Sequence, residues 1–122
     1  MAKALEGIKV LDLSRALAGP YCTMMLADMG AEVIKIEMPG RGDDSRSWGP
    51  PFVEGESAYF MSINRNKKSI TLNMKSDKST EIVHKLIKQS DVLVENFRPG
   101  AMERLGLGYE QVKAMNPRII YS

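Results

Sequence analysis

Short runs rich in apolar and β-branched residues are spaced along the whole chain. They cover residues 9–13, 32–37, 69–72, 91–95 and 118–121. Runs of this length and composition, bounded by turn residues, are typical of buried strands. The pattern therefore predicts five strands.

The segments between these runs predict helices. Over residues 78–89, Ile82, Val83, Leu86 and Ile87 share one helical face, and charged residues fill the other. Shorter helices are predicted over residues 21–29, 57–64, 101–105 and 109–115. The first of these carries only two polar residues, so we expect it to be mostly buried.

Residues 38–56 differ from the rest of the chain, because four glycines and three prolines fall within them. Such a segment predicts neither a helix nor a central strand. A long ordered loop in a small domain is usually functional.

Strands that alternate with helices predict an α/β fold, with a parallel sheet flanked by helices and right-handed crossovers. Ligands of such sheets bind outside the carboxyl ends of the strands. The length of 122 residues fits one domain, 1–122. Because the last predicted strand ends the chain, we expect an incomplete, amino-terminal fragment of a larger fold.

Composition excludes several classes of protein. No apolar run approaches the ~20 residues that span a bilayer, and the start of the chain lacks a secretory signal. A single cysteine and a single histidine argue against disulfides and against a metal site. We therefore expect a cytoplasmic protein that binds neither metal nor membrane.

Charge is unevenly distributed although the net charge is only +2. Residues 1–61 hold 6 basic and 9 acidic side chains, whereas residues 62–122 hold 11 basic and 6 acidic ones. A basic half on a nearly neutral chain indicates a local anion site and not a nucleic-acid-binding protein.

Several basic residues follow predicted strands. Lys75 follows the third strand, and Arg98 and Arg104 follow the fourth, so they converge if these strands are neighbours. Both residue types bind phosphates, and Phe97 beside them can pack on a base. Ordinary solvated charge is an equal alternative. Arg15, after the first strand, either faces the same edge or lies on the surface.

Other candidates have a simpler explanation. We expect Asn96 to form a turn, Glu37 to be structural, Cys22 to be a small buried hydrophobe, His84 to lie on the surface and Trp48 to anchor the loop. The glycine pairs at 40 and 42 and at 106 and 108 lack the third glycine of a dinucleotide fingerprint, so we interpret them as turns.

Five blocks of the sequence share an order and a spacing with one known family. They are residues 7–12; 18–20 with 30–37; 39–43 with Arg46 and 48–51; 64–70; and 91–100 with 104–107. In these blocks the chain resembles the amino-terminal part of the family III CoA-transferases. This family includes formyl-CoA transferase, L-carnitine CoA-transferase and α-methylacyl-CoA racemase.

The resemblance implies a Rossmann-like domain that binds coenzyme A or an acyl-CoA. Carried over by position, the implied contacts are Leu17, Ala18, Met38, Leu72, Asn73, Lys75, Asn96, Phe97, Arg98, Arg104 and Leu105. The formyl-CoA branch commonly has glutamine in place of Leu17 and arginine in place of Met38. These two departures speak against transfer between formate and oxalate and favour a bulkier or more apolar acyl group.

The reaction that the resemblance implies moves CoA to a carboxylic acid acceptor. An aspartate forms a mixed anhydride and then an aspartyl-CoA thioester. That aspartate is expected beyond Ser122, so we predict no catalytic residue here and no turnover by this chain alone. The family also forms interlocked homodimers. Two alternatives stay open: an acyl-CoA racemase or isomerase, and a non-catalytic nucleotide-binding module.

Overall fold

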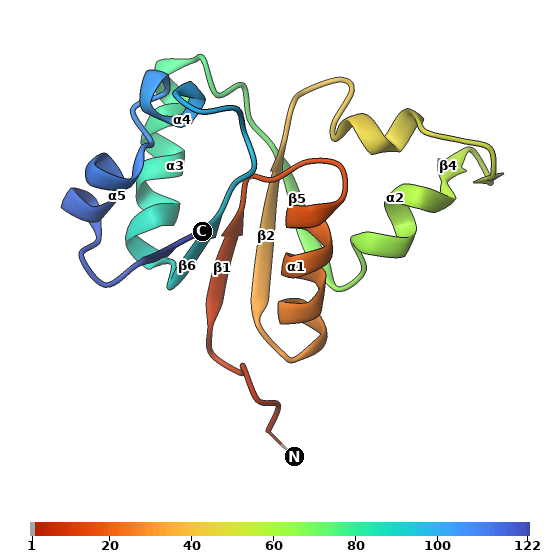
Figure 1. Ribbon diagram of the computed structural model, residues 1–122, viewed down its shortest axis with the longest axis horizontal. Coiled ribbons are helices and arrows are strands. Elements are labelled where there is room, and N and C mark those ends of the chain that lie inside the picture. Colours follow the sequence, from red (N-terminus) through yellow and green to blue (C-terminus); the bar gives the residue numbers. More distant parts are fainter. Residues whose placement is uncertain (1) are drawn as a thin grey trace.

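The computed structural model describes residues 2–122 and contains a five-stranded sheet between two layers of helices (Figure 1). The strands are β1 (Lys9–Asp12), β2 (Glu32–Glu37), β5 (Lys67–Thr71), β6 (Val92–Val94) and β7 (Ile120–Tyr121). Their order is β5-β2-β1-β6-β7, and all neighbours run parallel. The predicted α/β fold with a parallel sheet is confirmed.

The strand order reverses direction at β1. From β1 the chain adds β2 and then β5 on one side, and it later returns to place β6 on the other side. A parallel sheet opens a crevice outside the carboxyl ends of its strands at such a reversal. The topology alone therefore points to the carboxyl ends of β1 and β6.

Helices cover both faces of the sheet. They are α1 (Ala18–Asp28) on one face and α3 (Asp77–Gln89), α4 (Ala101–Arg104) and α5 (Tyr109–Met115) on the other. Val83 and Ile87 of α3 are completely buried against Leu11 and Leu93 of the sheet. On the opposite face, Ala27 of α1 belongs to a second apolar cluster. Because helices cover both faces of the sheet, the central strands carry apolar residues on both sides.

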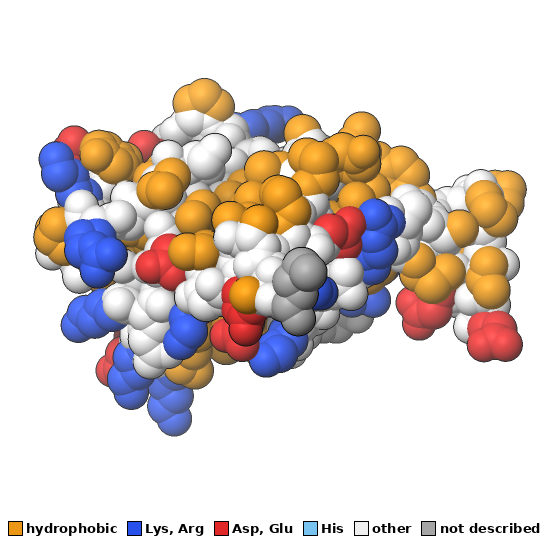
Figure 2. Space-filling view, turned by 90° about the horizontal axis from the view of Figure 1, so that it is seen from below, with side chains coloured by type: hydrophobic (Ala, Val, Ile, Leu, Met, Phe, Trp, Pro, Cys, Tyr) orange, Lys and Arg blue, Asp and Glu red, His pale blue; other side chains and the backbone are white. Residues whose placement is uncertain are grey.

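The prediction that the first helix is mostly buried is wrong. Only one stripe of α1, which includes Thr23, Met24 and Ala27, faces the sheet. Tyr21 and Met25 are exposed, and Cys22, expected to be buried, is exposed as well. Hydrophobic side chains accordingly gather on part of the surface (Figure 2). Apolar composition did not predict burial here because only one layer packs against this helix.

The glycine- and proline-rich segment has more local structure than the sequence predicts. It contains a 3₁₀ turn, η1 (Asp44–Ser47), and a separate two-stranded hairpin, β3 (Phe52–Val53) and β4 (Glu56–Ser57), followed by α2 (Ala58–Ile63). None of these elements joins the five-stranded sheet, as expected. Trp48 packs edge-on against Tyr59 with ring centres 5.2 Å apart, which agrees with an anchoring role.

The third strand begins earlier than predicted. β5 starts at Lys67 instead of Ser69, because Lys67 and Lys68 pair in register with Val33 and Ile34 of β2.

Within residues 2–122, no helix is long and apolar enough to cross a membrane.

Candidate functional site

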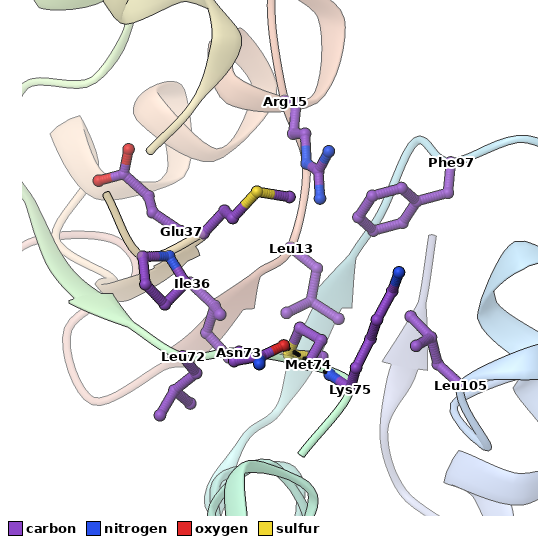
Figure 3. Close-up of a pocket in the computed structure, with 12 residues that line it drawn as sticks. Leu13, Arg15, Ile36, Glu37, Leu72, Asn73, Met74, Lys75, Phe97 and Leu105 are labelled. Carbon is purple, nitrogen blue, oxygen red and sulfur yellow. Dashed lines mark hydrogen bonds between the residues drawn. The ribbon is translucent and has the colours of Figure 1, made fainter. Parts of the chain in front are cut away.

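A cavity of about 410 Å³ lies outside the carboxyl ends of β1, β2, β5 and β6. Figure 3 shows its lining side chains, which come from the end of β2, from the segments that follow these strands and from the end of α4. They are Leu13, Arg15, Ile36, Glu37, Met38, Pro39, Leu72, Asn73, Met74, Lys75, Phe97 and Leu105. The cavity therefore occupies the place where parallel α/β sheets bind their ligands.

The condition under which Lys75 would converge with Arg98 and Arg104 is not met, because β5 and β6 are not neighbours and two strands separate them. Lys75 nevertheless lines the same cavity as Phe97. The Leu72 N–H bonds to the Glu37 carbonyl at 3.0 Å, and the chain then crosses the ends of the strands on its way to α3. This crossing brings Lys75 to Phe97.

The wall of the cavity combines apolar side chains with two cations. The guanidinium carbon of Arg15 lies 4.9 Å from the centre of the Phe97 ring. Neither Arg15 nor Lys75 forms an ion pair with a carboxylate in the part of the chain that the structure describes. An apolar cavity with uncompensated positive charge suits a ligand that is partly apolar and carries an anion.

Glu37 is the one carboxylate among the described residues of the wall, and its oxygens are occupied. Its Oε1 accepts from Arg46 Nε at 2.7 Å and from the Asp43 N–H at 2.8 Å, and its Oε2 accepts from Arg46 Nη2 at 2.8 Å and from Ser69. Burial alone would raise the pKa of Glu37, but these hydrogen bonds lower it to about 2. Glu37 is thus ionised at neutral pH and serves as a structural group, in agreement with the prediction.

The loop after β1 is fixed by side chains from two other segments. Lys35, which is 1% exposed, donates to the Ser14 carbonyl at 2.8 Å and pairs with Asp43 at 2.8 Å. Asp43 Oδ1 in turn accepts from the Ala16 N–H at 3.2 Å. Burial would raise the pKa of Asp43, but the bond from Lys35 holds it below its usual value. The neighbouring Asp44 is half-buried and accepts from Arg41 instead, so the two adjacent carboxylates have different partners.

The start of α1 packs closely on this loop, which explains the glycine at position 19. A Cβ at Gly19 would lie 2.2 Å from the Cβ of Ser14. Because no side chain fits in that space, glycine is required here.

Lys67 has a structural role that the sequence did not predict. Its amine is buried and donates to Asp12 Oδ2 at 3.1 Å, to the Pro20 carbonyl at 2.9 Å and to Asn64 Oδ1 at 2.8 Å. Burial lowers the pKa of Lys67, while Asp12 acts in the opposite direction. Lys67 is therefore a buried cross-link and not part of an exposed basic edge.

Comparison with known proteins identifies the family. Residues 5–122 match the sequence profile of CoA-transferase family III. The chain belongs to this family. Over 119 residues it is 58% identical to the succinyl-CoA:glutarate CoA-transferase of Mus musculus, covering 98% of this chain and 27% of that protein. It is 51% identical to the succinyl-CoA:mesaconate CoA-transferase of Haloarcula marismortui over 124 residues, 98% of this chain and 31% of that one.

A solved structure of a CAIB/BAIF family protein from Brucella suis has the same fold. The identity is 47% and the TM-score is 0.94, over 99% of this chain and 33% of that one. The chain thus spans about a third or less of the length of these relatives.

The structure brings together about half of the residues that the resemblance to family III implied. Six line the cavity: Met38, Leu72, Asn73, Lys75, Phe97 and Leu105. Five lie outside its lining: Leu17, Ala18, Asn96, Arg98 and Arg104. Leu17 and Ala18 are exposed at the start of α1, and Arg98 and Arg104 are exposed at and near α4.

Sequence reasoning missed three apolar residues and one proline of the wall and left Arg15 undecided. The missed residues are Leu13, Ile36, Met74 and Pro39. All lie within or just beyond the carboxyl end of a predicted strand, so strand-end position was the signal that could have found them. Among the described residues, no group of three or more histidine, cysteine, aspartate and glutamate side chains could hold a metal.

Proposed function

We propose that this chain forms the CoA-binding part of an enzyme that moves CoA between carboxylic acids. The observation that carries the proposal is the cavity at the sheet reversal, whose apolar wall holds Lys75 and Arg15 without carboxylate partners. Coenzyme A fits that chemistry, because it joins an adenine base and an uncharged pantetheine arm to several phosphates.

Within this cavity the roles divide by residue type. Lys75 would bind a phosphate, while Phe97 and Leu72 would contact the adenine through their apolar surfaces. The backbone at Ala18 and the guanidinium groups of Arg98 and Arg104 would meet parts of the ligand that extend beyond the cavity.

The acids exchanged are proposed to be dicarboxylic. The names of the two relatives pair succinyl-CoA with glutarate and with mesaconate. Leu17 and Met38 are uncharged at positions where the formyl-CoA branch carries polar side chains, and both are exposed for contact with an acyl group. The names of these relatives favour transfer over racemisation.

The covalent step is proposed to take place on an aspartate outside residues 1–122. Its carboxylate would attack the thioester carbonyl, displace the CoA thiolate and form a mixed anhydride. The thiolate would then attack the aspartyl carbonyl, release the first acid and leave an aspartyl-CoA thioester for the acceptor carboxylate. Glu37 does not serve as this nucleophile, because Arg46 and Ser69 engage its carboxylate.

The complete enzyme is proposed to be an interlocked homodimer.

Calorimetric titration with CoA tests the proposal. Wild-type protein should bind CoA, and Lys75→Ala should weaken binding by about 1.5–3 kcal/mol, the usual contribution of a charged hydrogen bond. Lys78→Ala is the matched control, because Lys78 is exposed in the first turn of α3 and lies outside the cavity. Absence of CoA binding by the wild-type protein, or equal effects of the two substitutions, would contradict the proposal.

A further inference from the structure

Arg15 lies on the cavity wall, and neither the family resemblance nor its sequence position assigned it a role. Its side chain is half-buried and extends over the Phe97 ring, at 4.9 Å from guanidinium carbon to ring centre. Among the described residues it forms no ion pair. A guanidinium held against an aromatic ring at a cavity, without a carboxylate to neutralise it, is available to an anionic ligand.

The backbone of Arg15 is clamped by the side chain of Asn96. Asn96 Oδ1 accepts from the Arg15 N–H at 2.9 Å, and Asn96 Nδ2 donates to the Arg15 carbonyl at 2.7 Å. Asn96 also precedes Phe97, so one dipeptide holds both the backbone and the side chain of Arg15. Because the amide of Asn96 is used in this pair of bonds, its side chain serves the loop and not the cavity.

The opposite side of the same loop is held by the buried pair of Lys35 and Asp43. Lys35 fixes the carbonyl of residue 14, and Asp43 fixes the N–H of Ala16. Ala16 has φ +69°, a left-handed conformation that residues other than glycine adopt only when their surroundings impose it. Contacts on both flanks thus fix the position from which the Arg15 side chain reaches the cavity.

The charges around Arg15 favour an anion at this point. Figure 3 shows the Arg15 and Lys75 side chains extending toward Phe97 from different segments of the wall. Glu37, the carboxylate of the wall, is neutralised by Arg46 and leaves this positive charge uncompensated. A planar guanidinium offers a phosphate two parallel N–H donors, which a lysine does not.

We propose that Arg15 is a phosphate-binding residue of this cavity and that Asn96 is the positioning residue that holds it there. The inference rests on the proposed function, because the phosphate is taken to belong to CoA. It differs from the assignment by resemblance, which made Asn96 a ligand contact and left Arg15 out.

The test compares CoA with pantetheine, which lacks phosphate groups, by calorimetric titration. Arg15→Ala should weaken CoA binding about 10- to 100-fold and leave pantetheine binding unchanged, since a charged hydrogen bond is lost only with CoA. Arg15→Lys keeps the positive charge but not the two parallel N–H donors, and it should weaken CoA binding less than Arg15→Ala does. Arg118→Ala, an exposed arginine outside the cavity, should bind CoA as the wild type does.

Two results would overturn the role of Arg15. One is unchanged CoA affinity in Arg15→Ala, and the other is an equal loss for CoA and pantetheine. Both results can be observed only if the wild type binds CoA. If the wild type itself does not bind CoA, the proposed function fails, and that outcome is distinct from these two. Circular dichroism melts of Arg15→Ala and Arg15→Lys verify that the variants are folded before titration.

A double-mutant cycle tests the positioning role of Asn96. Asn96→Ala should weaken CoA binding when Arg15 is present and should have no further effect in the Arg15→Ala background. An equal loss in both backgrounds would mean that Asn96 contacts the ligand directly and would overturn its positioning role. A loss of stability alone would not produce this dependence on Arg15.

Discussion

Each of three buried charged side chains near the cavity is paired with a side chain of opposite charge. This pairing distinguishes structural residues from those available to a ligand. Glu37 is bound to Arg46, Lys35 to Asp43 and Lys67 to Asp12. A buried charge without a partner is costly, so these pairs have to be complete. Arg15 and Lys75 line the cavity without such partners, which is why residue type alone did not distinguish them from Lys67.

The free energy of unfolding at low pH should depend on the ionisation of Glu37. Its pKa falls from 4.5 to about 2 in the folded state, so the stabilisation is present above pH ~4.5 and is lost as the pH drops toward 2. A shift of this size corresponds to about 3 kcal/mol. Urea unfolding should therefore show Glu37→Gln to be clearly less stable than the wild type at pH 7, with the gap closing by pH 2.

Glu110→Gln is the control for this measurement, because Glu110 is exposed in the first turn of α5. It should change stability little at either pH. A constant gap between Glu37→Gln and the wild type across the pH range would contradict the role given to the ionised carboxylate.

At the scale of single elements, periodicity was a better guide than composition. The helical spacing of apolar residues predicted the centre of the buried face of α3, because Val83 and Ile87 are at 0% exposure, but it wrongly included Ile82, which is 42% exposed at the edge of that face. Helix α1 is apolar on nearly every side, and its composition wrongly predicted that the helix is mostly buried. The periodicity of apolar residues indicates which side of a helix packs against the sheet, whereas apolar composition indicates only that some side of the helix can be buried.

Two neighbouring positions of α3 provide a direct test. Val83→Ala removes two methyl groups from a fully buried site and should cost about 1–3 kcal/mol, because a cavity remains. Ile82→Ala shortens a side chain that is 42% exposed and should cost clearly less, although it removes more atoms. Urea unfolding of both variants decides the matter, and a larger loss for Ile82→Ala would show that the helix packs on a different face.

At the scale of the whole molecule, buried polar contacts join segments that the sheet alone does not. The Lys67 amine of β5 reaches Asp12 of β1 across β2 and also bonds to a carbonyl of α1. Asp12 accepts further bonds from Ser14 and from Thr23. One polar cluster thus connects β1, β5, α1 and the loop that carries Arg15.

Adjacent lysines on β5 test this cross-link. Lys67→Met leaves the buried carboxylate of Asp12 without its cation and should destabilise the protein by about 3–5 kcal/mol. Lys68→Met breaks an exposed pair with Glu32, in which the lysine side chain is 72% exposed, and should cost at most about 1 kcal/mol. Thermal and urea unfolding compare the two, and equal losses would contradict the cross-link.

The sequence by itself determined the succession of strands and helices along the chain, the parallel sheet and the expectation that a ligand binds at the carboxyl ends of the strands. These features follow from local spacing of apolar residues and from the short list of ways in which α/β segments pack. The resemblance to family III, carried over position by position, implied six of the residues that line the cavity: Met38, Leu72, Asn73, Lys75, Phe97 and Leu105.

Only the tertiary structure decided which strands are neighbours and which charges meet. Two strands separate β5 from β6, yet Lys75 and Phe97 share one cavity because the chain crosses the strand ends between them. The partners that neutralise Lys35 and Lys67, and that clamp Arg15, are between 8 and 81 positions away in the sequence. Such contacts depend on how the segments fold back on one another, and no local pattern of residues records them.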